Sequence, residues 1–309
     1  MPLTKPQALL LSDDAQLGKL VENEPRRIQL AQMLPFYPVA GDRITVPRVT
    51  NANLGSAIWD TGGAAISDTP AIPTDPNASF SLKLLVSAFK VNGTAEYDML
   101  DTRIQVSVQV VGAVKRLYYK FWETVNLGDA SANPQEFEGL RRLVTTGQTL
   151  TARGGAGGIP ALRELDQLVG LITANGGRPH VLYTSRKGAE AIRRAYYRAQ
   201  IAPETVRLSV EDAGGGTRSV DVLAFDGIPV IVDDQVPSNE TANNYTSIYA
   251  LVLGTEGLYG VVPSGFEGDM IRAEKVLVNG LCQDSWVVYW PVGLALESQA
   301  GVARLQQVG

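Results

Sequence analysis

Apolar residues recur at alternating steps of three and four over residues 94–125, the spacing of one face of an α-helix. The set comprises Tyr97, Leu100, Ile104, Val108, Val111, Val114, Tyr118, Phe121 and Val125. Within it, Ile104 to Val110 also alternates at period two and is rich in β-branched residues, which leaves a strand as the alternative. The longer pattern favours a single helix, roughly 45 Å long.

Shorter periodic segments surround this helix. Residues 8–34 have helical spacing with a break at Pro25, and 43–50 alternate like a strand that Pro47 confines to a sheet edge or an extended arm. Two more helices are predicted at 159–175 and 185–200, and strands at 180–183, 206–210, 220–225, 228–232, 247–253 and 258–262. The last two predicted strands, 271–278 and 281–290, flank Asn279-Gly280, a strong hairpin signal.

Residues 51–92 have a different character. No Lys or Arg occurs between Asn51 and Leu82, whereas Gly and Pro are frequent and the apolar residues are few and scattered. Such a segment cannot bury itself, so its composition predicts an extended arm that becomes ordered on a neighbouring molecule. The side chains that we expect to make these inter-subunit contacts are Trp59, Asp60, Asp68 and Asp75.

Composition limits the class of protein. The 309 residues are 45% apolar and 19% charged, enough for one large or two modest globular domains. A net charge of −5 argues against tight, broad binding to nucleic acid. The single cysteine, Cys282, excludes an intrachain disulfide and is expected to be a small buried residue. The N-terminus has no signal-peptide core and no stretch is apolar enough to span a membrane, which predicts a soluble cytoplasmic chain.

Candidate chemistry is sparse. The only histidine, His180, has no partner motif, so a structural role is expected. Asp233-Asp234 precede a Pro-containing segment and suggest a solvated turn. The glycines at 154–158 lack the context of a phosphate-binding loop, which favours a flexible linker between subdomains. We therefore predict no catalytic residue, no metal and no cofactor.

The predicted helix at 185–200 is rich in arginine. Arg193, Arg194 and Arg198 form a possible partner surface, with Tyr196 and Tyr197 interleaved. A solvated helix face is the first interpretation of such a pattern. A subunit contact with the acidic loop and a nucleic-acid surface are the alternatives.

The order of these parts resembles the major capsid protein of tailed bacteriophages, which has the Hong Kong 97-type fold. Three phrases carry the resemblance. Asn133 to Leu140 (NPQEFEGL) follows the long helix, and His180 to Arg186 (HVLYTSR) is similar to the strand that leads into a helix of the family's axial domain. Phe225 to Asp234 (FDGIPVIVDD) looks like the Gly-Ile-Pro-Val strand late in that domain.

The resemblance implies an α+β fold with an N-terminal arm, an extended β-hairpin loop, a peripheral domain with a long spine helix, and an axial domain with a mixed sheet flanked by helices. On this basis the chain divides into the arm at 1–50, the loop at 51–92, the peripheral domain at 93–158, the axial domain at 159–265 and a return to the peripheral domain, with the closing hairpin, at 266–309. The loop would lie on an adjacent subunit.

The function that the resemblance implies is that of a non-enzymatic shell protein. It would assemble into hexamers and pentamers of an icosahedral phage head in the host cytoplasm and enclose double-stranded DNA without binding it tightly. Its partners would be a portal, a decoration protein and a separate scaffolding protein, which the early start of the arm favours. An encapsulin-like nanocompartment shell and a small oligomeric soluble enzyme are the alternatives.

Overall fold

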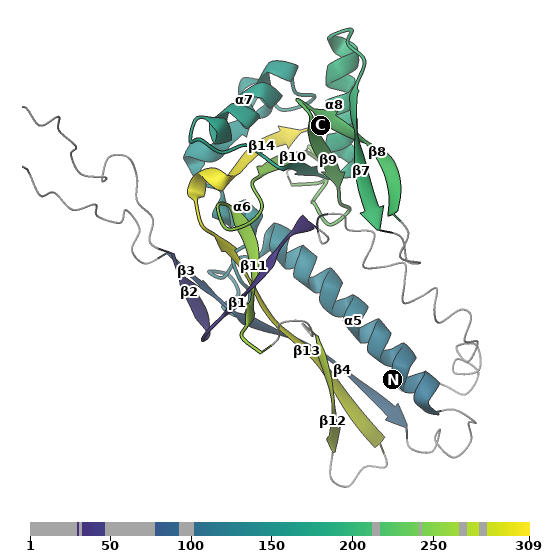
Figure 1. Cartoon of the computed structure of the whole chain (residues 1–309). Helices are drawn as coiled ribbons and strands as arrows, with labels where there is room; N and C mark the ends of the chain where they lie inside the picture. The colour runs from purple at the N-terminus through teal and green to yellow at the C-terminus, as the bar shows by residue number, and fades with distance from the viewer. Residues whose placement is uncertain are drawn as a thin grey trace, which may run out of the picture.

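The computed structural model describes residues 30, 33–46, 78–92, 102–211, 217–240, 243–265, 271–277 and 283–309. Only the backbone is described at 91–92, 102–107, 210–211, 217–218, 277 and 283–284. The described part is elongated (Figure 1). A long helix, α5, runs beside one β-sheet along the lower part of the molecule and ends beneath a second sheet at the other end.

Helix α5 spans Thr102–Leu127. This confirms the helical interpretation of the apolar pattern over the strand alternative; the predicted start, residues 94–101, lies outside the described residues. At 1.5 Å per residue its 26 residues extend about 39 Å. Ala113, Leu117, Phe121 and Val125 recur at every fourth position and are buried along one face. Phe121 and Val125 belong to the predicted apolar set, whereas its members Val108, Val111, Val114 and Tyr118 are only half-buried.

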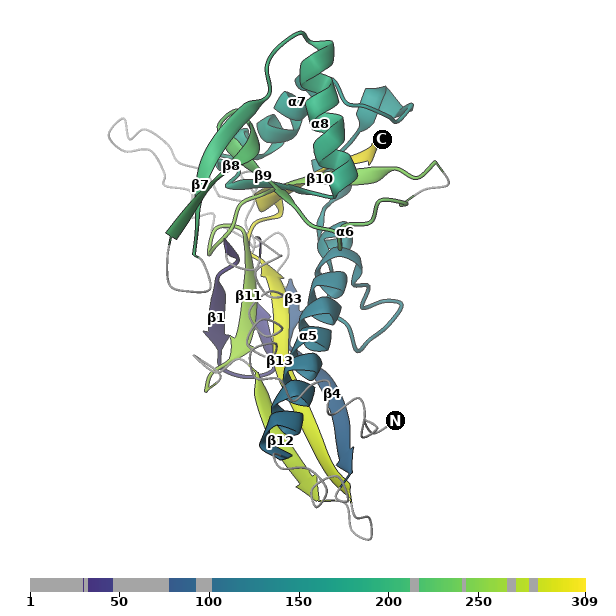
Figure 2. The same ribbon diagram turned by 90° about the vertical axis from the view of Figure 1, so that its right-hand side faces the viewer.

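The first sheet, here called the peripheral sheet, packs against α5 (Figure 2). Its path is β1(Phe36–Val39)-β11(Leu258–Pro263)-β13(Gln283–Leu296)-β12(Arg272–Leu277), and β4(Lys83–Asn92) pairs with β13 on the other side. β13 is therefore its central strand. Phe121 of α5 and Trp290 of β13 lie with their ring centroids 4.8 Å apart, so large aromatic side chains join helix to sheet.

The predicted closing hairpin is confirmed in its strands. β12 and β13 pair antiparallel from Arg272↔Tyr289 to Leu277↔Asp284. Its turn, Asn279-Gly280, lies outside the described residues, as does Cys282. β13 continues past the predicted end at Trp290 to Leu296, because its second half also pairs with β11.

The second sheet, here called the axial sheet, has the order β5-β14-β10-β6-β9-β8-β7. Its strands are β5(Thr149–Thr151), β6(Val181–Thr184), β7(Glu204–Glu211), β8(Thr217–Phe225), β9(Ile228–Val232), β10(Thr246–Leu251) and β14(Val302–Val308). Helices α7(Leu162–Thr173) and α8(Arg186–Arg198) pack on one face of this sheet, and the side chain of Ser185 caps α8 by accepting the backbone N–H of Gly188. Both helices and all these strands except β5 and β14 were expected from their patterns.

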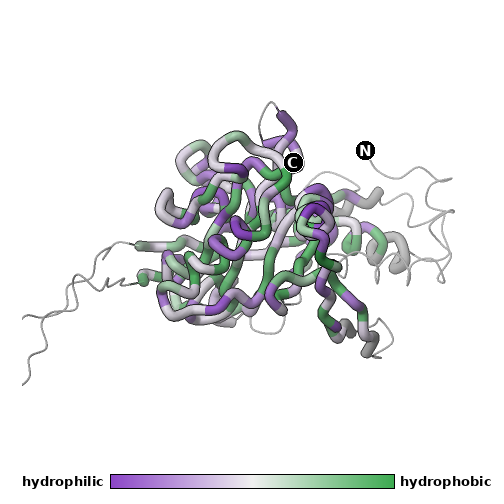
Figure 3. Tube along the Cα trace, turned by 90° about the horizontal axis from the view of Figure 1, so that it is seen from above, coloured by the Kyte–Doolittle hydropathy of each residue, from purple (hydrophilic) through white to green (hydrophobic). Residues whose placement is uncertain are grey.

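One hydrophobic core passes between the two parts of the molecule. Tyr183 and Tyr249, on the axial face opposite the two helices, belong to the same buried cluster as Phe121 and Trp122 of α5. Seen from above, the apolar stretches, drawn in green, are spread through the molecule rather than gathered in one part (Figure 3). The junction between the sheets is therefore a packed interior.

Sheet membership differs from the predicted division of the chain. β14 lies at the C-terminus yet pairs with β10 of the axial sheet, and β5 pairs with β14 there. Conversely, β11 pairs with β13 in the peripheral sheet. β4 is a strand of the peripheral sheet, although 51–92 was assigned to the loop, and β1 of the arm joins the same sheet. An alternating pattern identifies a strand, but it does not show which strand, distant in sequence, pairs with it in the sheet.

The glycines at 154–158 do not form a flexible linker, so this prediction is wrong. Gly157 and Gly158 lie in a packed turn: the backbone N–H of Gly158 donates to the carbonyl of Gln307, and a Cβ on Gly157 would meet the ring of Tyr245 at 2.5 Å. Gly154 and Gly155 are exposed and have open space around them. Four of the five residues have positive φ, which glycine adopts without strain. Glycine is used here for close approach to the C-terminal strand.

Candidate functional site

The described residues contain no group of three or more His, Cys, Asp or Glu side chains placed to hold a metal ion. No helix in this part of the chain is both long and apolar enough to cross a membrane. His180 precedes β6 and its Nδ1 accepts the backbone N–H of Leu253 at 3.0 Å, a contact that ties two loops together. Its role in this structure is thus to fix the backbone.

Asp233 is not part of a solvated turn, which corrects the prediction for the Asp233-Asp234 pair. Its side chain is 5% exposed, whereas Asp234 lies at the surface. One carboxylate oxygen accepts the Tyr183 hydroxyl at 2.5 Å and the other accepts the backbone N–H of Gln235 at 2.9 Å. Burial raises the pKa of the Asp233 carboxyl above its ordinary value, against the effect of these hydrogen bonds.

The Tyr183 hydroxyl links this carboxylate to the spine helix. It accepts a 3.1 Å hydrogen bond from the side-chain amide of Asn126, near the end of α5. The same Asn126 amide also donates to the backbone carbonyl of Trp122 at 2.9 Å. A buried relay, Asn126 to Tyr183 to Asp233, therefore crosses the junction between α5 and the axial sheet.

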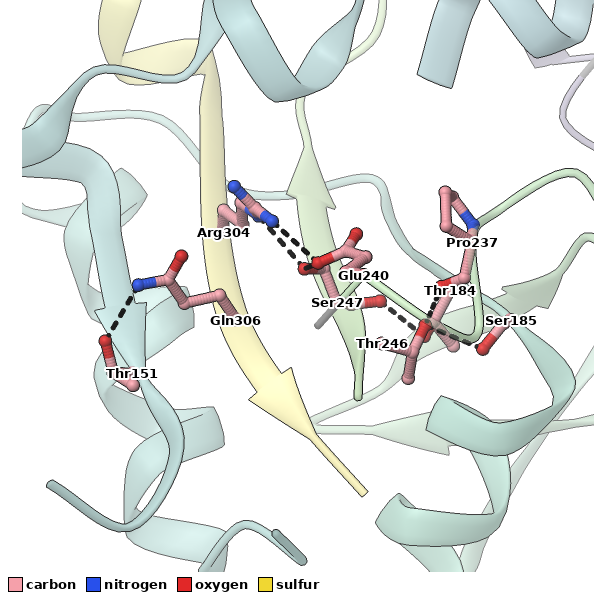
Figure 4. A network of polar contacts seen from close by, with 9 residues as sticks. All are labelled: Thr151, Thr184, Ser185, Pro237, Glu240, Thr246, Ser247, Arg304 and Gln306. Atoms are coloured by element: carbon pink, nitrogen blue, oxygen red, sulfur yellow. Dashed lines mark hydrogen bonds and ion pairs between the residues drawn. The ribbon is translucent and has the colours of Figure 1, made fainter. Parts of the chain in front are cut away.

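A second buried network fixes the loop between β9 and β10 (Figure 4). Arg304 of β14 contacts Glu240 at 2.7 Å and donates to the Ser247 hydroxyl at 3.0 Å, and Ser247 donates to Glu240 at 2.6 Å. Thr246 donates to the carbonyl of Pro237 from the same strand. Both charged side chains are almost fully buried, so each charge is compensated by the other instead of by water.

The predicted partner surface lies on α8. Arg193, Arg194 and Arg198 all point away from the sheet and are exposed, and Tyr197 beside them is 66% exposed. Arg194 lies 3.9 Å from Glu190, one turn earlier. Tyr196 instead packs inward, and its hydroxyl donates to the carbonyl of Ala224. This geometry is that of a solvated basic face, and its use as a partner surface stays a prediction.

The predicted loop contacts, Trp59, Asp60, Asp68 and Asp75, lie outside the described residues. What the structure describes is the base of the loop. β2(Arg43–Thr45) and β3(Ser79–Ser81) pair antiparallel, and the N–H of Val46 donates to the carbonyl of Ala78 at 2.8 Å. The two ends of segment 47–77 therefore start and finish side by side.

Sequence reasoning missed a groove beside β4. A cavity of about 140 Å³ is lined by Lys83, Leu84, Leu85, Val86, Lys120, Thr124, Asn133, Gln135, Glu136 and Phe137. Lys83 Nζ donates to the carbonyl of Pro134 at 2.7 Å, and Lys120 pairs with Glu136 at 3.3 Å. The NPQEFEGL phrase could have indicated this groove, because its residues Asn133, Gln135, Glu136 and Phe137 form one wall.

Comparison with known proteins extends over nearly the whole chain at the level of structure. No protein-family model and no curated protein matches the sequence. A chain of the holo-SrpI encapsulin complex from Synechococcus elongatus PCC 7942 is similar with a TM-score of 0.70 and 20% identity, over 93% of this chain and 89% of that one. The capsid of a native GTA particle gives 0.63 and 17% over 92% and 91%.

A chain from Microbacterium phage Oxtober96 is also similar, with a TM-score of 0.55 and 12% identity over 89% of both chains. The chain therefore has the Hong Kong 97-type capsid fold. This confirms the α+β class and the fold that the three sequence phrases indicated.

Proposed function

We propose that this chain is a major shell protein that assembles with itself into hexamers and pentamers of a closed icosahedral particle, and that the particle is a phage head enclosing double-stranded DNA. The observation that carries the proposal is the likeness of fold to capsid and encapsulin chains over about nine-tenths of both partners. A likeness that extends over the whole architecture of the chain is consistent with a geometric task, such as forming a shell.

The described structure supports assembly through an extended loop. The ribbon β2–β3 holds together the ends of segment 47–77, and residues 51–77 of this segment include no Lys or Arg and few apolar residues. In a closed shell each subunit gives and receives such a contact, so a weak contact is multiplied over the particle. Trp59 would be its aromatic anchor, because a large aromatic on a thin arm fills a pocket at low entropic cost.

Deletion of residues 58–76 tests this assembly role. The two sheets and α5 are complete without these residues, so the variant is expected to fold and melt like the parent but to form few closed particles. Trp59→Ala should also reduce the yield of closed particles, but by less than the deletion. A parental yield of particles from the deletion variant, measured by electron microscopy and native sizing, would refute the role of the loop.

The second candidate is an encapsulin-like nanocompartment. The TM-score of 0.70 with an encapsulin chain, against 0.63 with the GTA capsid, is the observation that favours it. The contents of nuclease-treated native particles separate the two functions. Protected double-stranded DNA supports the phage head, whereas a uniform protein cargo without DNA supports the compartment.

The proposed partners follow from the phage-head function. With a net charge of −5 the shell would not hold DNA by charge neutralisation, so packaging through a portal and its motor is proposed. A separate scaffolding protein and a decoration protein belong to the same proposal. Empty particles are expected to bind added duplex weakly at physiological salt, and tight binding would contradict this part of it.

A further inference from the structure

Helix α8 concentrates positive charge in a chain whose net charge is −5. Its 13 residues include four Arg and one Lys, and Glu190 is the one acidic residue among them. A charged helix face is usually only solvated, so the placement and the pairing of these charges decide whether the face does more.

The exposed charges of α8 lie on one face of the helix. Its buried residues are Gly188, Ala189, Ala191, Ile192, Ala195 and Tyr196. At 3.6 residues per turn Arg186, Arg193 and Tyr197 are aligned on the opposite face, and Arg194 and Arg198 flank this line. Figure 2 shows α8 along the surface of the axial part, with no described element in front of it. The face is therefore open to a partner.

The arginines of this face lack strong acidic partners. Arg207 of β7, in contrast, lies 3.2 Å from Asp221. In the part of the chain that the structure describes, Arg186, Arg193 and Arg198 have no ion pair. Unpaired cations grouped on one face repel one another, and a polyanion bound to the face relieves this repulsion.

The chemistry of the face favours a phosphate backbone over an acidic protein. From Arg186 to Arg198 the helix rises roughly 18 Å, and a duplex carries about ten phosphate charges over the same length. Guanidinium groups bind phosphate oxygens through two parallel hydrogen bonds, and the Tyr197 hydroxyl at the surface is a further donor. A protein partner is normally held by a side chain that fills a pocket, whereas this helix face is convex.

We propose that the exposed face of α8 binds the phosphate backbone of double-stranded nucleic acid without reading its sequence, and that in the proposed particle it contacts the packaged duplex. The second part rests on the proposed function. Contact with three or four phosphates weakens about a hundredfold between about 50 and 200 mM salt, so one subunit binds DNA weakly at physiological salt. Repetition of the contact over the shell gives it its effect.

Binding of a short duplex to the unassembled chain tests the site itself. Anisotropy of a labelled duplex of about 20 base pairs, titrated at several salt concentrations, should give a slope of log K against log salt of about −3. Arg193→Gln with Arg198→Gln should weaken binding about tenfold at low salt and make the slope shallower by about 2. The matched control is Arg43→Gln with Arg163→Gln, because these exposed arginines of β2 and α7 change the net charge equally but lie outside the face. It should bind like the parent.

The titrations separate this proposal from its competitors. Loss of affinity and slope in the α8 variant alone supports it. Equal losses in both double variants would show that only net charge matters, and no duplex binding by the parent at any salt would remove the site; either result overturns the proposal. Poly-glutamate is the competing ligand, and binding that is tighter to it than to the duplex would assign the face to an acidic protein and overturn the proposal as well.

Photocross-linking in native particles tests the contact with packaged DNA. Tyr197→Cys, combined with Cys282→Ala so that no other thiol is present, carries an azidophenyl group that attaches to nearby nucleic acid on illumination. Leu84→Cys on β4 is the matched control, since Leu84 is 62% exposed and Tyr197 is 66% exposed. We expect about fivefold more protein–DNA adduct from position 197, because phosphate contacts hold it beside the backbone.

The particle experiment also distinguishes this contact from the proposed function. DNA-filled particles with the expected preference for position 197 support the proposal. DNA-filled particles with equal adducts or none overturn it and leave the phage-head function standing. Particles without DNA contradict the phage-head function and, with it, the contact inside the particle, while the duplex titration decides the site on α8 separately.

Discussion

The hydroxyl of Tyr183 in β6 donates a 2.5 Å hydrogen bond to the buried carboxylate of Asp233, which follows β9. Asn126 of α5 donates to the same hydroxyl, so the polar relay and the shared hydrophobic core join the spine helix to the axial sheet. The two parts therefore behave as one body at this junction. Adaptation to different positions in a shell is expected to come from elements at the margin, such as the β2–β3 ribbon.

Tyr183→Phe removes this link at almost constant volume. Asp233 then loses a donor and the Asn126 amide loses an acceptor, both in the interior, so the free energy of unfolding should fall by about 1–3 kcal/mol. Calorimetry of the unassembled chain measures the loss. Tyr197→Phe, where the hydroxyl is at the surface, is the control and should change nothing; equal effects would contradict the relay.

The raised pKa of Asp233 predicts a pH dependence of stability. In the folded state its carboxyl holds a proton more tightly than at the ordinary pKa of 3.8, because burial disfavours the charged form. The contribution of Asp233 is therefore most favourable at low pH and declines as pH rises from 3.8 through the folded-state value.

The measurement is the difference in free energy of unfolding between the parent and Asp233→Asn across this range, from denaturant titrations of the unassembled chain. The parent should lose stability relative to the variant as pH rises. A relative gain would mean that the folded structure favours the charged carboxylate and lowers its pKa.

Arg304→Met should destabilise the chain strongly. It leaves the Glu240 carboxylate buried without its cation, a loss of about 3–5 kcal/mol in comparable sites. Adding Glu240→Gln should restore part of the loss. Arg207→Met removes the exposed pair with Asp221 and should cost less than about 1 kcal/mol. Chemical denaturation compares the variants, and a similar cost for the two arginines would show that the buried network does not stabilise the fold.

Gly157→Ala tests whether the glycine-rich turn is packed. A methyl group there meets the Tyr245 ring in addition to the cost of positive φ, which together should lower stability by about 2 kcal/mol or more. Gly154→Ala has a similar φ but open space around its Cβ, and should cost about 1 kcal/mol. If thermal unfolding shows no difference, the turn is not packed as described.

Periodicity was enough to predict α5, α7, α8 and the β12–β13 pairing, because their apolar spacing and the Asn279-Gly280 signal are local properties. It was not enough for β14 or for Asp233. β14 joins β10 from more than fifty residues away, and the burial of Asp233 depends on Tyr183 and Asn126, both distant in sequence. The exposure of Leu84 and Val86 on β4, at 62% and 52%, was missed for the same reason: the alternation is visible in the sequence, but only the fold shows which side of the strand packs against α5.

The most direct test of the proposed function is electron microscopy of the protein purified in its native state, together with its native mass. The proposed shell function predicts closed particles of megadalton mass, with the elongated subunit seen here arranged in rings of five and six and the 47–77 segment on a neighbouring subunit. A monomer or small oligomer at all concentrations, with no closed particles, would contradict it.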